Sequence, residues 1–254
     1  GGAGDPHRHR RTPRLSRSQS RHFRGRIKPH VIEVRDVTHS YGDRMVLREV
    51  SAALTERRIA VIGANGSGKS TFARLLNGLV VPQQGEVRVS GLSTRSDAAA
   101  VRRLVGFVFT DPDAQIVMPT VAEDVAFGLR RRKLGAAESQ RRVFAALSDL
   151  GLEIFADHPA HLLSGGEKQL LALCSVLVTE PQVLVCEERT TLLDRRNSRR
   201  VLEILDRLPQ QVILVTHHLE SVADYDRVLV FDEGALVADG DPQAAVDHYR
   251  ALVG

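Results

Sequence analysis

The stretch that decides the fold reads Gly63-Ala64-Asn65-Gly66-Ser67-Gly68-Lys69-Ser70-Thr71. It follows the short apolar run 59–62, which is typical of a buried strand, and it precedes the helical pattern 72–79. A strand, a glycine-rich loop and a helix in this order form a P-loop, whose backbone N–H groups turn towards a phosphate. The anion then lies at the positive end of the helix. The stretch therefore predicts a bound nucleoside triphosphate, with Lys69 on its β- and γ-phosphates and the Ser70 hydroxyl on Mg²⁺.

Composition limits what else the chain can be. Its 254 residues, 43% of them hydrophobic, fit one large α/β domain with small attached lobes. No run approaches the roughly 18 to 20 apolar residues that span a bilayer, and there is no hydrophobic signal-peptide core, so a membrane channel is not expected. Cys174 and Cys186 lie in apolar runs. We expect both to be reduced core residues of a cytoplasmic protein.

The positive charge is concentrated near the start of the sequence. Residues 1–29 hold eight arginines, one lysine and one aspartate, a net charge of +8, so the remainder of a chain with a total of +4 carries −4. A segment this poor in apolar residues cannot bury enough surface to order itself. We therefore expect a disordered basic tail over 1–29 and a folded domain over 30–254. The functional alternatives for the tail are an anchor for anionic lipid or RNA and a transit peptide.

A second phosphate-facing motif, Leu163-Ser164-Gly165-Gly166-Glu167-Lys168-Gln169, lies about 100 residues further on. Ser164 and Glu167 have the spacing of a capping box at the start of a helix, and a helix start bordered by glycines offers bare N–H groups to a phosphate. The motif resembles the signature sequence of ATP-binding cassette (ABC) ATPases. In that family, the signature of one subunit caps the ATP held by the P-loop of another. The resemblance implies ATP as ligand, a dimer as the working unit, and Ser164, Gly165 and Gly166 as nucleotide contacts.

The order of the predicted elements also resembles the ABC ATPase domain, from about residue 31 to 250. These elements are a half-buried strand at 31–37, an edge strand at 85–90, a buried strand at 105–109, a helical stretch at 120–162, short strands at 183–185 and 212–215, and a hairpin at 228–238 around Glu233-Gly234. The resemblance implies an α/β P-loop NTPase with a RecA-like core and an antiparallel β lobe. It also implies a helical lobe inserted at about 111–165.

The resemblance assigns roles to four further residues. Tyr41 lies at the position of the aromatic residue that stacks on adenine. Glu188 takes the place of the carboxylate that activates the attacking water, and His217 that of the switch histidine at the γ-phosphate. Asp194 takes the place of the D-loop aspartate at the dimer interface.

Three positions depart from the family pattern. Glu187 stands where the family has the aspartate that holds the Mg²⁺ hydration shell, and Thr110 stands where it has a glutamine that contacts Mg²⁺ or water. Arg189 replaces a proline beside Glu188. Gln115 is close to Thr110 in sequence, but a residue five positions away is not equivalent. We still place Glu187 and Thr110 with Ser70 on the metal side, and we expect ATP binding to tolerate these changes better than hydrolysis does, because Mg²⁺ demands tight geometry.

Three segments resemble energy-coupling-factor ATPases, which drive uptake of vitamins and metal ions in prokaryotes. They are Asp111-Pro112-Asp113-Ala114-Gln115, Thr120-Val121-Ala122-Glu123-Asp124-Val125-Ala126-Phe127-Gly128 and Thr216-His217-His218-Leu219-Glu220. Within this group, Thr191-Leu192-Leu193-Asp194 and the short C-terminus look most like the biotin-uptake ATPase. Cobalt and nickel uptake ATPases are the close alternative.

By this resemblance, the chain is a peripheral protein on the cytoplasmic face of the membrane. Its partners are a second ATPase subunit, identical or different, a transmembrane coupling protein and a substrate-binding membrane protein. Two other hypotheses stay open. The departures at Glu187, Arg189 and Thr110 motivate a degenerate regulatory subunit with weak hydrolysis, and the basic tail motivates an ABC protein that acts on nucleic acid. We expect no nucleic acid partner.

Overall fold

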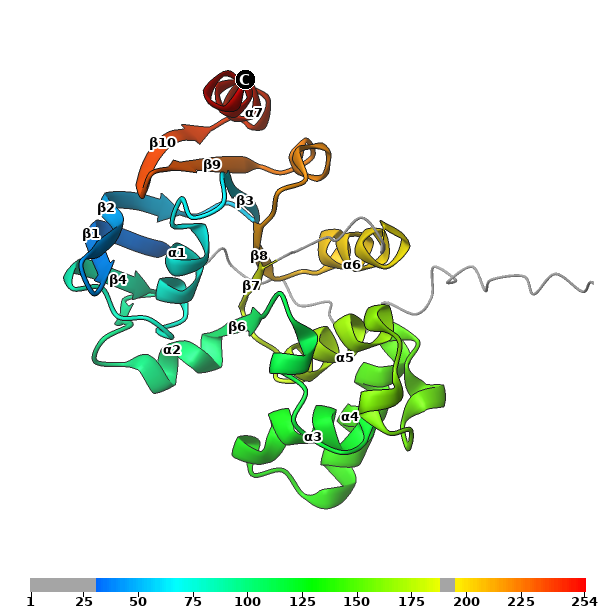
Figure 1. Ribbon diagram of the computed structural model, residues 1–254. Helices are drawn as coiled ribbons and strands as arrows, with labels where there is room; N and C mark the ends of the chain where they lie inside the picture. Colours follow the sequence, from blue (N-terminus) through cyan, green and yellow to red (C-terminus); the bar gives the residue numbers. More distant parts are fainter. Residues whose placement is uncertain (1–30, 188–194) are drawn as a thin grey trace, which may run out of the picture.

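Two β-sheets with helices on either side make up the protein (Figure 1). The computed structural model describes residues 31–187 and 195–254. The larger sheet has six strands in the order β10-β9-β3-β8-β7-β6. They are β3 (Arg58–Gly63), β6 (Val105–Val108), β7 (Val183–Glu187), β8 (Gln211–Val215), β9 (Arg227–Asp232) and β10 (Ala235–Gly240). Neighbouring strands are parallel except β9 and β10, as expected of strands that alternate with helices.

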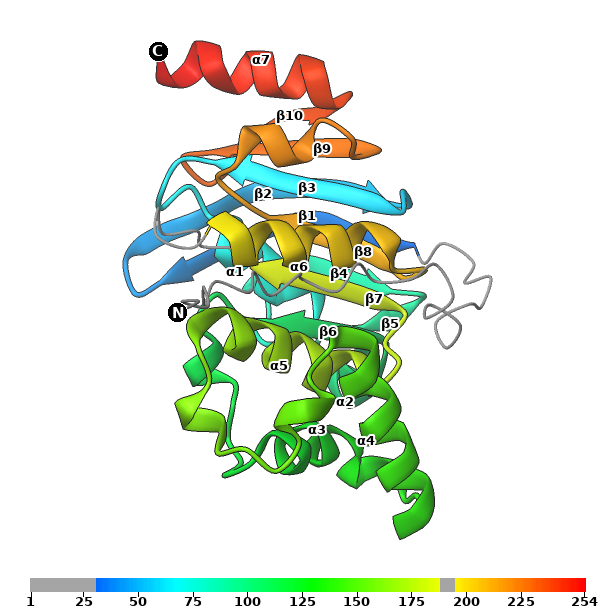
Figure 2. The same cartoon turned by 90° about the vertical axis from the view of Figure 1, so that its right-hand side faces the viewer.

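The P-loop strand β3 lies inside this sheet, between β8 and β9, and all its residues are buried. Successive side chains of a strand point to opposite faces, so Val61 belongs to one hydrophobic core and Ile62 to the other. The core of Val61 also holds helix α1 (Lys69–Leu76). The core of Ile62 holds α5 (Gly165–Leu177) and α6 (Arg195–Arg207). Helices α1 and α5 therefore pack on opposite faces of the sheet (Figures 1 and 2).

The smaller sheet is antiparallel, with the strand order β2-β1-β4-β5. Its strands are β1 (Ile32–Tyr41), β2 (Arg44–Leu54), β4 (Gln84–Val89) and β5 (Leu92–Ser93). Its inner face packs in the same core as α1. The prediction of an edge strand at 85–90 is wrong in one respect, because β4 lies between β1 and β5. A turn at Ser90-Gly91, where φ is 50° and 82°, folds the chain back and adds the two residues of β5.

Helices dominate the chain between β6 and α5, in the green part of Figure 1. The longer ones are α3 (Val121–Leu129) and α4 (Ala136–Leu150), and the short 3-10 turns are η1 (Pro112–Ala114), η2 (Arg130–Arg132), η3 (Glu153–Phe155) and η4 (Ala160–Leu162). A capping box between Thr120 and Glu123 begins α3, and Gly151, with a φ of 69°, ends α4. The prediction of a helical stretch at 120–162 is confirmed.

Strand β6 leads into this helical part from the edge of the larger sheet. A short helix, α2 (Ala98–Leu104), precedes it. The prediction of a buried strand at 105–109 needs correction, because within the described residues β6 lies at the edge of the sheet beside β7. Val105 and Phe107 are buried, whereas Gly106 and Val108 are partly exposed.

The last strands form the predicted hairpin. Its two-residue turn, Glu233-Gly234, has φ values of 43° and 84°, which the primed turns of tight hairpins require. The Gly234 N–H donates to the Ser67 carbonyl at 3.1 Å, so this turn contacts the P-loop. A short turn, η5 (Leu219–Val222), precedes the hairpin, and helix α7 (Pro242–Val253) follows it and packs against β9 and β10.

The cysteines and the helix lengths agree with what the sequence predicts. Cys174 and Cys186 are buried and are not joined in a disulfide, as predicted. None of the helices in the described part of the chain combines the length and apolar character needed to cross a membrane.

A buried arginine on β3 holds the end of α6. The Arg58 guanidinium donates to the carbonyls of Leu205 at 2.9 Å, Asp206 at 3.0 Å, Leu208 at 2.5 Å and Gln210 at 2.8 Å. The last carbonyls of a helix have no partner within the helix and carry partial negative charge. Arg58 therefore satisfies the C-terminus of α6 from the strand that leads into the P-loop.

We expect Arg58→Met to lower the free energy of unfolding by about 3 kcal/mol, because it leaves several buried carbonyls without a donor. Urea unfolding followed by circular dichroism measures the loss. The matched control is Arg103→Met at an exposed position of α2, which should cost less than about 1 kcal/mol. Equal losses in the two variants would show that Arg58 does not act as this cap.

Candidate functional site

The P-loop joins the end of β3 to the start of α1 through a backbone that requires glycine. Gly63 has a φ of 148°, and a Cβ there would lie 2.1 Å from the Phe231 carbonyl oxygen. Gly68 has a φ of 101°, and its Cβ would lie 2.6 Å from the Val46 carbonyl oxygen. Larger residues are therefore excluded at both positions by conformation and by space. The β lobe and the C-terminal hairpin thus enclose the loop from two sides.

Lys69 lies in the centre of this loop and is only 5% exposed. Its ammonium donates to the Gly63 carbonyl at 2.7 Å, to the Ala64 carbonyl at 2.6 Å and to the Ser67 hydroxyl at 3.4 Å. Burial lowers the pKa of this ammonium from 10.5 to about 8. No acidic side chain balances the charge within the first turn of α1. A buried cation held by neutral carbonyls is a suitable binding group for an anion.

The start of α1 is suited to the same anion. Gly68 at the N-cap position supplies no side-chain cap. The first N–H groups of a helix lack partners within the helix, so they can bind a phosphate. Asn65, Gly66 and Ser70 are exposed, whereas Ser67 and Thr71 are buried beneath the loop. The structure thus brings together the predicted residues 63–71 as one cradle for phosphate.

A buried carboxylate, Glu187, lies beside the cradle at the end of β7. Its Oε2 atom is 3.5 Å from the Arg74 guanidinium and accepts a 3.5 Å hydrogen bond from the Thr110 hydroxyl. The Ser70 side chain also lies near this carboxylate and lowers its pKa. Burial raises the pKa of the Glu187 carboxyl, and these neighbours oppose the rise by stabilising the charged form. The three residues predicted on the metal side, Ser70, Thr110 and Glu187, therefore lie together.

The chemistry of this donor set fits Mg²⁺. Oxygen ligands suit the ion, which usually retains several waters and takes one or two carboxylates from the protein. The Oε1 atom of Glu187 is buried and has no hydrogen-bond partner, which a metal-bound water would provide. Among the described residues, no three His, Cys, Asp or Glu side chains lie close enough together to hold a metal ion. A site made of one carboxylate and two hydroxyls would therefore need such waters as further ligands.

Tyr41 lies at the end of β1 and is 50% exposed. Its ring meets the His39 ring edge to face, with centroids 4.9 Å apart and planes at 84°. Burial lowers the pKa of His39, which favours the neutral form of this supporting imidazole. An exposed ring with a fixed neighbour is suited to stack on a flat base.

The second motif begins α5 with a complete capping box. The Ser164 hydroxyl accepts from the Glu167 N–H at 3.4 Å, and the Glu167 carboxylate accepts from the Ser164 N–H at 2.8 Å. Ser164 and Gly165 are exposed, whereas Gly166 is buried. Helices α1 and α5 occupy opposite faces of the sheet, so the two phosphate-facing motifs of one chain begin helices that pack in different cores.

The predicted switch histidine follows β8, the neighbour of the P-loop strand. His217 is exposed, whereas Thr216 is buried and its hydroxyl accepts from the His218 N–H at 3.0 Å. The carboxyl ends of parallel strands β3, β7 and β8 therefore carry the P-loop, Glu187 and His217. Glu188, Arg189 and Asp194 lie outside the described residues, as does the predicted tail.

Arg74 was missed in the sequence analysis, and the hydrogen bonds of Gln115 could not be predicted there. Arg74 pairs with Glu187, and its position four residues after Ser70 places both on one face of α1. That spacing was a usable signal. Gln115 is bound through its amide to the Phe109 N–H and the Ala172 carbonyl, each at 3.0 Å. It does not take the position of Thr110, as expected.

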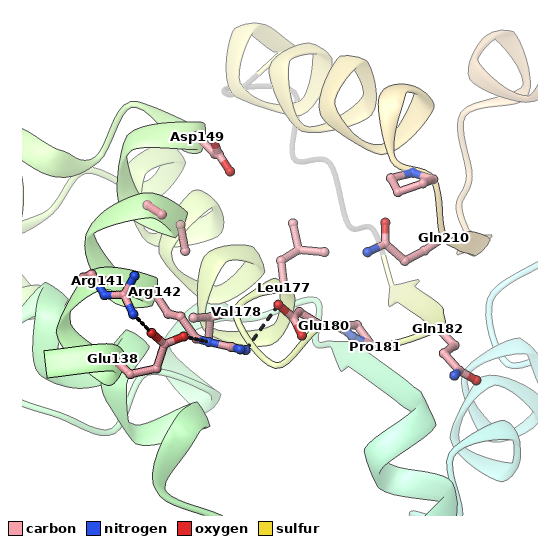
Figure 3. A pocket seen from close by; sticks show the side chains of 13 residues that line it. Glu138, Arg141, Arg142, Asp149, Leu177, Val178, Glu180, Pro181, Gln182 and Gln210 are labelled. Carbon is pink, nitrogen blue, oxygen red and sulfur yellow. Dashed lines mark hydrogen bonds and ion pairs between the residues drawn. The ribbon is translucent and has the colours of Figure 1, made fainter. Parts of the chain in front are cut away.

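A pocket of about 500 Å³ lies away from the cradle, between α4, the end of α5 and the loop at 208–210 (Figure 3). Several of the charged side chains that line it pair with one another. Glu138 pairs with Arg141 and Arg142, and Arg142 also reaches Glu180. Because these charges balance locally, the pocket lacks the excess positive charge and bare N–H groups of the P-loop cradle. We do not place the nucleotide there.

Comparisons with known proteins agree with this geometry. The family model described as ABC transporter matches residues 47–191. A putative ABC transporter ATP-binding protein from Deinococcus radiodurans is 54% identical, over 87% of this chain and 97% of that protein. The biotin transport ATP-binding protein BioM from Rhizobium etli is 48% identical, over 84% and 95%. An energy-coupling factor transporter ATP-binding protein from Methanoculleus marisnigri is 43% identical, over 83% and 79%.

Solved structures show the same fold. The protein cbiO1 from Clostridium perfringens, part of the ABC transporter complex cbiONQ, gives a TM-score of 0.76 at 30% identity, over 88% of this chain and 93% of that one. The ATP-binding cassette MJ0796, in a dimeric post-hydrolysis state with ADP and phosphate, gives 0.73 at 25% identity, over 83% and 98%. The predicted fold class and the resemblance to energy-coupling-factor ATPases are confirmed. The chain therefore belongs to the ABC transporter family, as an ATP-binding subunit with the ATPase domain of that family.

Proposed function

We propose that this chain is the ATPase subunit of a membrane importer, which dimerises on ATP and hydrolyses it to drive uptake of a vitamin, with biotin favoured. The observation that carries the proposal is that the two phosphate-facing motifs begin separate helices, α1 and α5, which pack in different cores on either side of the sheet. Each needs a partner to complete a site. The 48% identity to a protein named for biotin transport supports the choice of cargo.

The P-loop residues hold the triphosphate in this proposal. Lys69 exchanges the carbonyls of Gly63 and Ala64 for the β- and γ-phosphates, because an ionic hydrogen bond to phosphate is stronger than one to a neutral carbonyl. The N–H groups of residues 65–71 surround the phosphates, and the Tyr41 ring stacks on adenine. Ser70, Glu187 and Thr110 hold Mg²⁺ and its waters, and the ion neutralises charge on the phosphates.

Hydrolysis requires an activated water on the γ-phosphate. Glu188 directly follows β7 in sequence and acts as the general base. His217, after the neighbouring strand β8, contacts the γ-phosphate. In the dimer, Ser164, Gly165 and Gly166 of one subunit cover the ATP of the other, and Asp194 lies between the subunits. Glu187 and Thr110 both differ from the family pattern, but the hydrogen bond between them keeps both side chains at the metal side of the site. This arrangement favours a working ATPase over a degenerate subunit.

The importer also needs membrane proteins. The described part of this chain holds no membrane-spanning helix, so the transport path belongs to the proposed transmembrane coupling protein and substrate-binding protein. The ATPase then lies on the cytoplasmic face of the membrane. Cobalt or nickel is the alternative cargo, because the ATPase itself does not contact the cargo.

Lys69→Ala should abolish ATP binding, since it removes the cation that faces the phosphates. Isothermal titration calorimetry with MgATP measures the affinity. Arg131→Ala, which removes an exposed cation in the helical part, should leave the affinity unchanged. Binding by Lys69→Ala within about threefold of the unmodified chain would refute the proposed site.

Glu188→Gln should preserve ATP binding, stop turnover and trap an ATP-bound dimer, because glutamine keeps the size of the side chain and removes the base. Gel filtration with and without MgATP detects the dimer, and phosphate release measures turnover. Undiminished phosphate release would exclude Glu188 as the base. A monomer in saturating ATP would argue against the proposed dimer.

The cargo is tested by uptake in the organism that encodes this chain. Deleting the gene should abolish uptake of labelled biotin, and the unmodified gene should restore it whereas the Lys69→Ala gene should not. Labelled cobalt and nickel serve as the comparison. Normal biotin uptake together with lost metal-ion uptake would assign the importer to metal ions instead.

A further inference from the structure

Three side-chain bridges tie the segment after β6 to one face of α5. The Lys168 ammonium pairs with the Asp113 carboxylate at 2.7 Å. The Gln115 amide donates to the Ala172 carbonyl at 3.0 Å. The Ser175 hydroxyl donates to the Asp124 carboxylate at 2.8 Å. Positions 168, 172 and 175 are four and three residues apart, so the bridges follow one face of the helix over two turns.

The Gln115 side chain uses both atoms of its amide group to join two segments. Its amide oxygen accepts from the Phe109 N–H at 3.0 Å, while its amide nitrogen donates to Ala172 in α5. Phe109 directly precedes Thr110, whose hydroxyl contacts Glu187. One neutral side chain therefore connects the metal side of the nucleotide site to the helix that begins with the signature motif.

Asp124 holds the rest of the segment in place. It is only 3% exposed, and its carboxylate accepts from the Val117 N–H at 2.8 Å and the Met118 N–H at 3.1 Å, besides the Ser175 hydroxyl. A buried carboxylate with three donors is costly to disrupt. The segment 109–118 and α5 therefore form one unit, and a displacement of Thr110 is passed to the start of α5.

We propose that Gln115 is a positioning residue for the ATPase reaction, which fixes the signature end of α5 relative to Thr110 and Glu187 of the same chain. The proposal rests on the dimer proposed above. In that dimer, the signature of one chain covers the ATP bound by its partner. Gln115 then couples the two ATP sites, because each chain holds its own ATP at Glu187 and the other ATP at Ser164. A helix is stiff enough to carry this coupling over the distance from Ala172 to Ser164.

The substitution Gln115→Glu should keep the hydrogen bond to Phe109 and remove the one to Ala172. A carboxylate still accepts from the Phe109 N–H, but it places an oxygen against the Ala172 carbonyl, and two acceptors repel each other. The variant therefore keeps the loop bonded to β6 and disconnects it from α5. Gln140→Glu is the matched control, because it makes the same chemical change at an exposed position of α4.

The kinetic test compares both variants with the unmodified chain. We expect Gln115→Glu to bind MgATP with an affinity within about twofold of the control. Its kcat should fall about tenfold, and the Hill coefficient for ATP should fall to about 1. Kinetics equal to those of Gln140→Glu would overturn the proposal. So would a loss of ATP affinity in proportion to kcat, since that would indicate general damage to the site.

Hydrogen exchange gives a readout that does not depend on turnover or on the dimer. At a protein concentration that keeps the chain monomeric, MgATP should slow amide exchange of residues 165–172 in the unmodified chain and in Gln140→Glu. The same amides should not respond in Gln115→Glu that has bound MgATP. An equal response in all three proteins would overturn the proposal. A monomeric chain that responds yet hydrolyses ATP without cooperativity would instead contradict the proposed dimer.

A second variant tests the proposal if Gln115→Glu does not fold. If Gln115→Glu does not give a cooperative thermal transition, Gln115→Met removes both hydrogen bonds at similar volume and without a charge. Ser175→Ala breaks the outermost bridge and should lower kcat in the same direction but less. Full activity and cooperativity in Gln115→Met would overturn the proposal.

Discussion

The burial of the Lys69 ammonium among backbone carbonyls is the constraint on which the rest of the structure depends. A cation that is 5% exposed needs fixed partners, and the carbonyls of Gly63 and Ala64 supply them. This arrangement requires the tight path between β3 and α1. The Val46 carbonyl of the β lobe and the Gly234 turn of the C-terminal hairpin both lie close against the backbone of this loop. Segments from three parts of the chain therefore meet around the loop that holds this ammonium.

Strand β3 leads into the P-loop and also contributes to both hydrophobic cores of the protein. Its alternating side chains pack against α1 on one face of the sheet and belong to the core of α5 on the other. A single chain thus begins α1 with the P-loop and α5 with the signature motif in different cores. In the proposed dimer, the signature of each chain covers the ATP at the P-loop of the other. The bridges from Asp113, Gln115 and Asp124 to α5 then supply a physical connection between the two ends of each chain.

Local patterns were sufficient to predict the P-loop, the capping box at Ser164 and the Glu233-Gly234 hairpin, because each depends on residues close in sequence. Contacts between distant segments were not predictable in this way. Gln115 and Ala172 are 57 residues apart, and Arg58 and Leu208 are 150 apart. The exact place of β4 and β6 in their sheets also depends on pairing between distant strands. Residues 188–194 include Glu188 and Asp194, whose roles stay predictions.

The most direct test of this account is a crystal or cryo-electron microscopy structure of the chain with Mg²⁺ and a non-hydrolysable ATP analogue. We expect two chains face to face, with Lys69 Nζ moved from the carbonyls of Gly63 and Ala64 to the phosphates. We also expect the start of α5 in one chain to cover the nucleotide of the other. A nucleotide bound away from the P-loop, or a Lys69 that remains on the carbonyls beside a bound triphosphate, would contradict it.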